Sequence, residues 1–234
     1  MVKKDFPKIK EKPYLPLQVE SYDVPPKPKE VFLELPSLPR TWFVSKNENE
    51  ILQVQSDQFL INWRKLDPQD RYPHYDEIIE KFFKYSNCFE KFVSEENLGE
   101  IACNQFELTY VNHITSSNGG GSGVLLEEIF PDFKTGSEGK KFLPNTESVN
   151  WTNTYLLPNQ EGRLYSTIRS AWHKEHQNEP IIQFQLSVRG VGKDLSPTGI
   201  RKWFDQAHDW IVLPFADLTS EQVQNKYWGR SDND

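Results

Sequence analysis

The chain is short of sulfur-containing residues and of long apolar runs. Its 234 residues include two cysteines and one methionine. Cys88 and Cys103 match no zinc or redox spacing, and two thiols do not make a disulfide framework, so we expect both to be reduced and packed. No apolar run approaches the roughly 18 residues that a membrane span needs, and the basic start lacks the apolar core of a signal peptide. These absences predict a cytoplasmic protein that does not use a membrane.

Aliphatic residues are also scarce, and positive charge is outnumbered by negative charge. Hydrophobic residues make up 36% of the chain, aromatic residues make up 13%, and the formal net charge is −7. A chain of this length can still bury a substantial core, because large rings fill the space that aliphatic residues leave. The acidic balance disfavours non-specific adhesion to nucleic acid or to an anionic membrane, although a local basic stripe would reverse that expectation.

Segments rich in proline, glycine or charged residues divide the chain into five parts. Proline fixes the backbone and removes hydrogen-bond donors, so a segment rich in Pro and Lys predicts a flexible or extended arm. A short strand at 31–35 follows it. The predicted parts are an arm at 1–29, a first βββαβ half at 30–118, a loop-rich connection at 119–148, a second βββαα half at 149–230 and a tail at 231–234.

Residues 41–65 alternate in hydrophobicity and predict a three-stranded meander with turns at 47–49 and 56–57. The pattern then changes to helical spacing from Tyr75, with Pro73 at the start and Gly99 as a stop. Alternation returns at 104–114, which predicts another strand.

The second half repeats this order. Segments 148–157, 162–174 and 180–191 predict three strands. An apolar stripe then predicts a long helix with Ser196 as N-cap and Pro197 in its first turn, and Thr219 with Gln222 predicts a capping box for a last short helix. The fold class that follows is α+β, with an antiparallel sheet packed on two long amphipathic helices and a pseudo-duplication of a βββα unit.

The strands carry polar side chains on one face. Period-two alternation sends Phe59, Ile61 and Trp63 to the core, and Asn62 and Arg64 to the opposite side. The same alternation in the later strands sends Leu164, Ile168 and Trp172 inward. An ordinary solvent-facing sheet explains these polar residues, and a partner-binding surface rich in Arg and amide groups explains them as well. The candidate binding residues are Gln53, Gln55, Asn62, Arg64, Thr109, His113, Arg169, Gln183, Gln185 and Arg189.

Catalytic signals are weak. His113 ends a strand just before a glycine-rich loop, and it could act as an acid or base with Glu107 or Arg64 nearby. His173 and His176 have no third ligand in register, so we expect no metal. The glycine-rich loop lacks the lysine of a phosphate-binding loop, and we expect no cofactor.

Several segments together resemble a sporadically distributed prokaryotic family that has no assigned activity. They are PRTWFVS, ILQVQSDQFLINWRK, YPHYDEIIEKF, ELTYVNHI and AHDWIVLPFADLTSEQVQNKYWGR. Members usually begin with a short strand that opens on a Pro-Pro pair, which VPPKPKEVFLEL matches only loosely. The patchy distribution of the family implies mobile genes, as in phage-defence or toxin–antitoxin settings. The resemblance singles out Gln53, Gln55, Asn62, Trp63, Arg64, Tyr110, Asn112, His113 and Trp228 to Arg230.

The leading hypothesis is a non-catalytic binding protein from such a mobile prokaryotic gene set. It would hold a protein segment or a small polar ligand on the polar sheet face. The alternatives are an enzyme acting on a nucleotide or phosphate ester through His113, and a nucleic-acid binder. The sequence leaves the oligomeric state open.

Overall fold

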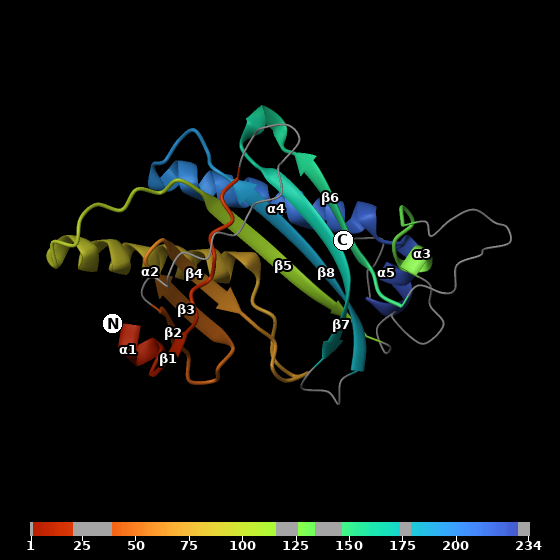
Figure 1. Cartoon of the computed structure of the whole chain (residues 1–234), viewed down its shortest axis with the longest axis horizontal. Helices are drawn as coiled ribbons and strands as arrows, with labels where there is room; N and C mark the ends of the chain where they lie inside the picture. The colour runs from red at the N-terminus through yellow and green to blue at the C-terminus, as the bar shows by residue number, and fades with distance from the viewer. Residues whose placement is uncertain (1, 21–38, 116–125, 134–146, 174–178, 229–234) are drawn as a thin grey trace, which may run out of the picture. The chain divides into compact units, whose positions relative to one another are not determined.

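The computed structural model shows a mixed α/β protein with two four-stranded antiparallel sheets (Figure 1). The chain divides into two compact units, Met1–Cys103 and Asn104–Asp234. None of the helices in the described segments is long and apolar enough to cross a membrane. The strand predicted at 31–35 and His176 lie outside the described residues. The described residues are 2–20, 39–115, 126–133, 147–173 and 179–228.

The sheet of the first unit is an antiparallel meander in the order β1-β2-β3-β4. Its last three strands are the predicted ones, and Glu48, with φ at 63°, lies in the turn between β2 and β3. The first strand lies inside the segment that the sequence predicts as an arm, and it pairs with β2. The strands are β1 (Lys8–Lys12), β2 (Arg40–Val44), β3 (Glu50–Gln55) and β4 (Gln58–Trp63).

The N-terminal residues take part in the core of the first unit. Phe6 follows the short helix α1 (Val2–Asp5), and its side chain is 1% exposed. It packs edge-on against Tyr85, with ring centroids 5.1 Å apart, and both belong to a cluster with Leu52. The N-terminal segment is therefore packed structure rather than a free tail.

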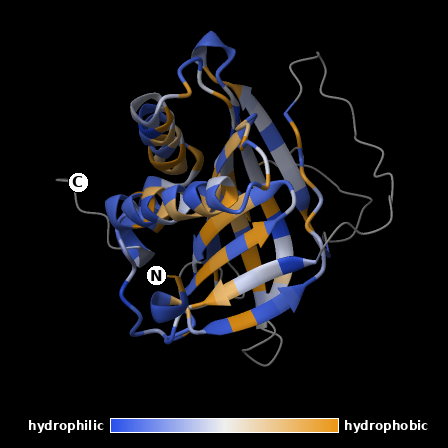
Figure 2. Cartoon of the chain, turned by 90° about the vertical axis from the view of Figure 1, so that its left-hand side faces the viewer, coloured by the Kyte–Doolittle hydropathy of each residue, from blue (hydrophilic) through white to orange (hydrophobic). Residues whose placement is uncertain are grey.

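Helix α2 (Tyr75–Glu95) covers one face of β4, and its amphipathic spacing predicted it. Phe59 of β4 stacks against Phe89 of the helix at 5.5 Å, so the predicted inward direction of Phe59 is confirmed. The helix begins one residue after its N-cap, His74, so Pro73 lies before the first turn rather than in it. Figure 2 shows hydrophobic and hydrophilic residues alternating along the strands and dividing the helices into two sides.

The second sheet has the order β5-β8-β7-β6. The sequence assigned the strand at 104–114 to the first half, whereas β5 pairs antiparallel with β8 inside the second unit. The short helix α3 (Leu126–Ile129) and a single 3-10 turn, Pro158–Gln160, connect the strands. The strands are β5 (Phe106–Ile114), β6 (Asn150–Leu156), β7 (Arg163–His173) and β8 (Glu179–Gly190).

Helix α4 (Pro197–Leu218) packs against β5 and β8. Phe184, Leu186 and Val188 of β8 are fully buried, as alternation predicts. Trp172, which alternation also sends inward, is instead 66% exposed because it lies near the end of the β7–β8 hairpin. Odd or even position in a strand (its parity) sets the face to which a side chain points. Whether that side chain is buried depends on whether another element packs against it there.

One of the two helix N-caps predicted from local sequence is confirmed, and the other is wrong. The Ser196 side chain accepts a hydrogen bond from the Gly199 N–H at 3.1 Å, so the predicted N-cap of α4 is confirmed. The predicted capping box of α5 (Glu221–Tyr227) is wrong, because the N-cap is Ser220. The Thr219 hydroxyl donates instead to the Phe215 carbonyl at 2.7 Å, at the end of α4.

Candidate functional site

Cross-strand register builds a polar face on the second sheet. Residues that face each other across antiparallel strands point to the same side of the sheet, so four partners form a row across β5, β8, β7 and β6. The alternate rows point to the side where α4 packs. The four rows of the polar face are Glu107–Arg189–Arg163–Leu156, Thr109–Ser187–Tyr165–Thr154, Val111–Gln185–Thr167–Thr152 and His113–Gln183–Arg169–Asn150.

One end of this polar face is open. The Arg169 Nε donates to the Gln183 carbonyl oxygen, and the Gln183 amide nitrogen lies 3.4 Å from His113 Nε2. Arg169 and His113 are exposed, and Gln183 is half-buried. The three side chains thus form a hydrogen-bonded row whose guanidinium and imidazole are exposed to solvent.

The other end of the polar face is closed and held by its own contacts. The Arg189 Nε donates to a Glu107 carboxylate oxygen at 2.8 Å, and its guanidinium lies 5.1 Å from the centre of the Tyr165 ring. The Arg189 side chain is 11% exposed. Ser187 is 1% exposed and bonds to the Thr109 hydroxyl at 2.7 Å. Arg189 and Thr109 therefore stabilise the sheet from its more buried end, while His113 and Arg169 lie at the exposed end.

His113 and Glu107 do not meet. Both belong to β5 and lie six positions apart on it, which separates their backbones by about 20 Å. The carboxylate of Glu107 is instead bonded to Arg189 and to the Thr109 hydroxyl. The structure therefore does not support the predicted pairing of His113 with Glu107 as acid and base.

Two predicted binding residues of the first unit are buried. Gln53 is 4% exposed and Gln55 is 7% exposed. The Gln55 side chain forms two hydrogen bonds with the backbone of Leu15. Its amide oxygen accepts from the Leu15 N–H at 3.2 Å, and its amide nitrogen donates to the Leu15 carbonyl at 2.9 Å. Asn62 is exposed on β4, as predicted. Cross-strand register puts Asn62 on the same side of the sheet as the two glutamines, so this side is covered only in part, which alternation alone could not reveal.

Arg64 is held by the turn between β2 and β3. Its Nε donates to the Glu48 carbonyl at 3.1 Å, and its backbone N–H donates to the Asn49 carbonyl at 2.8 Å. The Asn49 side chain is 5% exposed and donates to the Arg64 carbonyl and to Asp70 Oδ2. Arg64 follows a strand and is half-exposed, as its parity predicts, but its polar groups are engaged in fixing this turn.

Acid is expected to destabilise the first unit through Asp70. Backbone N–H donation from Asp67 and then Leu66, with the Asn49 amide, lowers the pKa of Asp70 below its ordinary value of 3.8. A carboxyl whose folded pKa is depressed contributes stability above its unfolded pKa and loses that contribution as pH falls through the folded pKa. Urea midpoints measured from pH 6 to pH 3 should therefore fall most steeply below about pH 4.

Asp70→Asn should make that decline shallower, because the titrating group is removed, while the exposed Glu100→Gln should leave it unchanged. An identical pH dependence for Asp70→Asn and the native chain would contradict this role.

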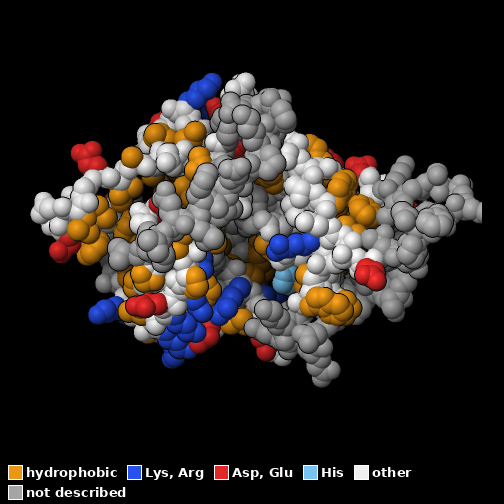
Figure 3. All heavy atoms as spheres, viewed as in Figure 1, with side chains coloured by type: hydrophobic (Ala, Val, Ile, Leu, Met, Phe, Trp, Pro, Cys, Tyr) orange, Lys and Arg blue, Asp and Glu red, His pale blue; other side chains and the backbone are white. Residues whose placement is uncertain are grey.

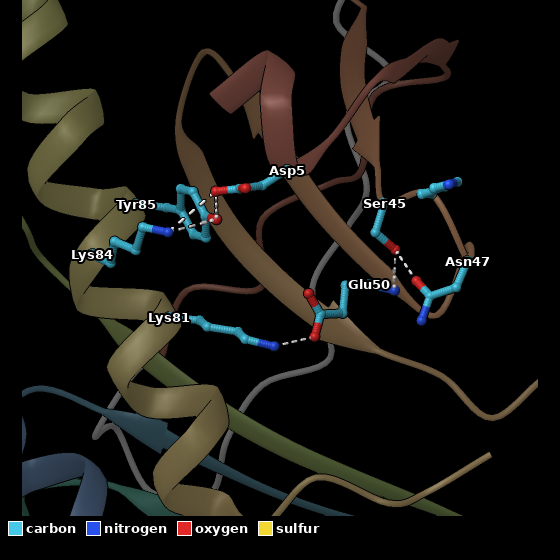
Figure 4. A pocket seen from close by; sticks show the side chains of 8 residues that line it. Asp5, Ser45, Asn47, Glu50, Lys81, Lys84 and Tyr85 are labelled. Carbon is cyan, nitrogen blue, oxygen red and sulfur yellow. Dashed lines mark hydrogen bonds and ion pairs between the residues drawn. The ribbon is translucent and has the colours of Figure 1, made fainter. Parts of the chain in front are cut away.

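A pocket of about 640 Å³ lies between α1, the β2–β3 turn and α2 in the first unit (Figure 4). Lys81 pairs with Glu50, and Lys84 pairs with Asp5 at 3.2 Å. The Tyr85 hydroxyl donates to Asp5 Oδ2 at 2.7 Å. The lining residues are Asp5, Ser45, Lys46, Asn47, Glu50, Lys81, Lys84 and Tyr85.

The chemistry of this pocket is mainly structural. Its carboxylates are engaged by lysines of α2, so its charges largely offset each other, and these contacts attach the N-terminal segment to the helix. Burial and then the Asp5 carboxylate raise the pKa of Tyr85, which therefore stays a neutral donor. The sequence predicted none of these residues, because they come from three distant segments.

No protein-family model matches the chain, and no solved structure matches it. The resemblance of its motifs to a prokaryotic family therefore stays a prediction. Within the described ranges, no group of three His, Cys, Asp or Glu side chains could hold a metal ion. The site that geometry favours is the open row His113–Gln183–Arg169.

Proposed function

We propose that the protein binds a protein segment or small polar ligand on the polar face of the second sheet, without catalysis. The row His113–Gln183–Arg169 carries the proposal. It presents a guanidinium, an amide and an imidazole in one line across three strands. Guanidinium N–H groups match a carboxylate or a peptide carbonyl, and an amide both donates and accepts.

The closed end of the same face supports this role. Ion pairing of Arg189 with Glu107 and the Thr109–Ser187 hydrogen bond hold β5 against β8. A rigid sheet positions side chains more accurately than a loop does, so little conformational entropy is lost when a ligand binds.

Arg169→Ala is expected to weaken ligand binding about tenfold or more, because a hydrogen bond to a charged group is removed. Native mass spectrometry of the gently purified protein would identify the co-purifying ligand. Titration calorimetry with that ligand would then compare the native chain, Arg169→Ala and a control variant.

The control is Arg71→Ala, which removes an exposed guanidinium from the first unit. We expect it to bind the ligand as the native chain does. Equal affinity of Arg169→Ala and Arg71→Ala for the ligand would overturn the proposal. Equal thermal unfolding of the two variants would show that the loss is not caused by unfolding.

Nucleic-acid binding is a second candidate. It is favoured by a basic strip on the first sheet, formed by Lys8, Lys10, Lys12 and Arg40. Lys12 Nζ and the Arg40 guanidinium lie 4.9 Å and 5.3 Å from the centre of the Trp42 ring. Arg40 Nε and Trp42 Nε1 are buried without a hydrogen-bond partner among the described residues. Figure 3 shows Lys and Arg side chains gathered near α1 and β1. Co-purification of nucleic acid rather than of a polypeptide or small molecule would favour this candidate.

The order of strands and helices is compatible with the predicted pseudo-duplication. The meanders β2–β3–β4 and β6–β7–β8 are each followed by a long helix, as a pseudo-duplication would require. The remaining strand of each sheet lies at a different edge of its meander. β1 pairs with β2, the first strand of its meander, whereas β5 pairs with β8, the last strand of its meander. Duplication, prokaryotic origin and a role in phage defence stay predictions.

A further inference from the structure

The edge strand β6 carries no charged side chain. Its sequence, NWTNTYL, is made of aromatic, β-branched, amide and leucine residues. Among the described residues it pairs with β7 alone, which leaves its second edge open. Tyr155 and Leu156 are 37% and 53% exposed. Natural proteins usually protect such an edge with lysine, proline or a bulge.

The edge strand β1 in the first unit shows that protection. It reads KIKEK, and its three lysines discourage pairing with another strand. The contrast indicates that β6 is left open for a partner.

The backbone of β6 shows which groups face the open edge. The Leu157 N–H donates to the Gly162 carbonyl, and the Val149 carbonyl accepts from the Ser170 N–H. Partners alternate along an antiparallel ladder, so odd-numbered residues of β6 bond to β7. The N–H and C=O groups of the even-numbered residues, including Thr152 and Thr154, therefore point away from β7.

We propose that β6 pairs antiparallel with β6 of a second copy of this chain, around a two-fold axis at Asn153. In this register Thr152 faces Thr154 of the second copy, and both present outward backbone groups, so each pair exchanges two hydrogen bonds. Trp151 faces Tyr155 of the second copy on the other side of the sheet. Thr–Thr and aromatic pairs are favourable cross-strand neighbours.

This proposal does not depend on the proposed function, since it rests on the open backbone edge of β6 and not on the row His113–Gln183–Arg169. Pairing would join the second sheets of two copies into one continuous sheet. A contact of one strand pair is small, so we expect a dissociation constant of about 10–100 μM.

Sedimentation velocity of the native chain should show the mass rising from the 27.4 kDa of one chain toward twice that value as concentration increases to about 100 μM. The double variant Thr152→Lys and Thr154→Lys should stay monomeric, because it places like charges opposite each other across the axis. The control Ile9→Lys, on the edge strand β1, should dimerise as the native chain does.

A second double variant, Thr152→Glu and Thr154→Glu, tests the register and the fold together. Alone it should be monomeric, but mixed with the lysine variant it should form a heterodimer, since opposite charges then face each other. Restored association would also show that both variants fold. A native chain that stays monomeric, a lysine variant that dimerises, or a mixture that does not associate would each overturn the proposal.

Discussion

Gly190→Ala is expected to lower the free energy of unfolding by about 3 kcal/mol or more. A Cβ at this position would lie 2.2 Å from the Glu161 carbonyl oxygen and 2.4 Å from Gly162 Cα. Both are backbone atoms and cannot rotate away. The Glu161 carbonyl also accepts a hydrogen bond from Trp203 Nε1 at 3.0 Å, so moving it would break the contact between this turn and α4.

Urea unfolding followed by tryptophan fluorescence and circular dichroism measures this effect. The matched control is Gly192→Ala, two residues further along, where a Cβ would lie no closer than 3.4 Å to another atom. We expect the control to change the free energy of unfolding by less than about 1 kcal/mol. Equal stabilities of the two variants would show that the close approach of Gly190 to Gly162 is absent.

Phe6→Ala is expected to cost about 3–5 kcal/mol, as large aromatic truncations in a core do. The ring is 1% exposed and packs against Tyr85 and Leu52, so its removal leaves a cavity. The Asp5–Tyr85 hydrogen bond lies one residue away and would lose its support. Thermal unfolding and urea midpoints should both fall.

Ile9→Ala is the control for Phe6, because Ile9 lies in the same N-terminal segment but is 54% exposed. Its truncation should cost less than about 1 kcal/mol, since little apolar area is removed from the core. If Phe6→Ala were as mild as Ile9→Ala, the N-terminal segment would be flexible, which is one of the two forms that its composition predicts.

Much of the local structure could be predicted because its causes lie within a few residues. The meander of β2, β3 and β4 follows from alternation and from turn residues at 47–49 and 56–57. The start of α4 follows from Ser196, whose side chain bonds to a backbone group three residues away. The faces of β8 follow from parity.

The candidate site could be predicted only in part. Parity placed Thr109, His113, Gln183, Gln185 and Arg189 on one face, and the register confirms that shared face. It could not separate the open row of His113 from the closed row of Arg189, because that difference comes from contacts made across strands.

Sequence alone determined the strands from β2 to β8, the helices α2 and α4 and the side of the sheet to which the residues of these strands point, since backbone sterics and side-chain period act locally. Tertiary structure decided that β5 joins β8, that Phe6 enters the core, that Gln53 and Gln55 are covered and that Arg64 holds a turn. Most of these outcomes depend on contacts between residues tens of positions apart. A pattern within a few residues cannot show which distant segments will pack together or how much their contact stabilises the fold.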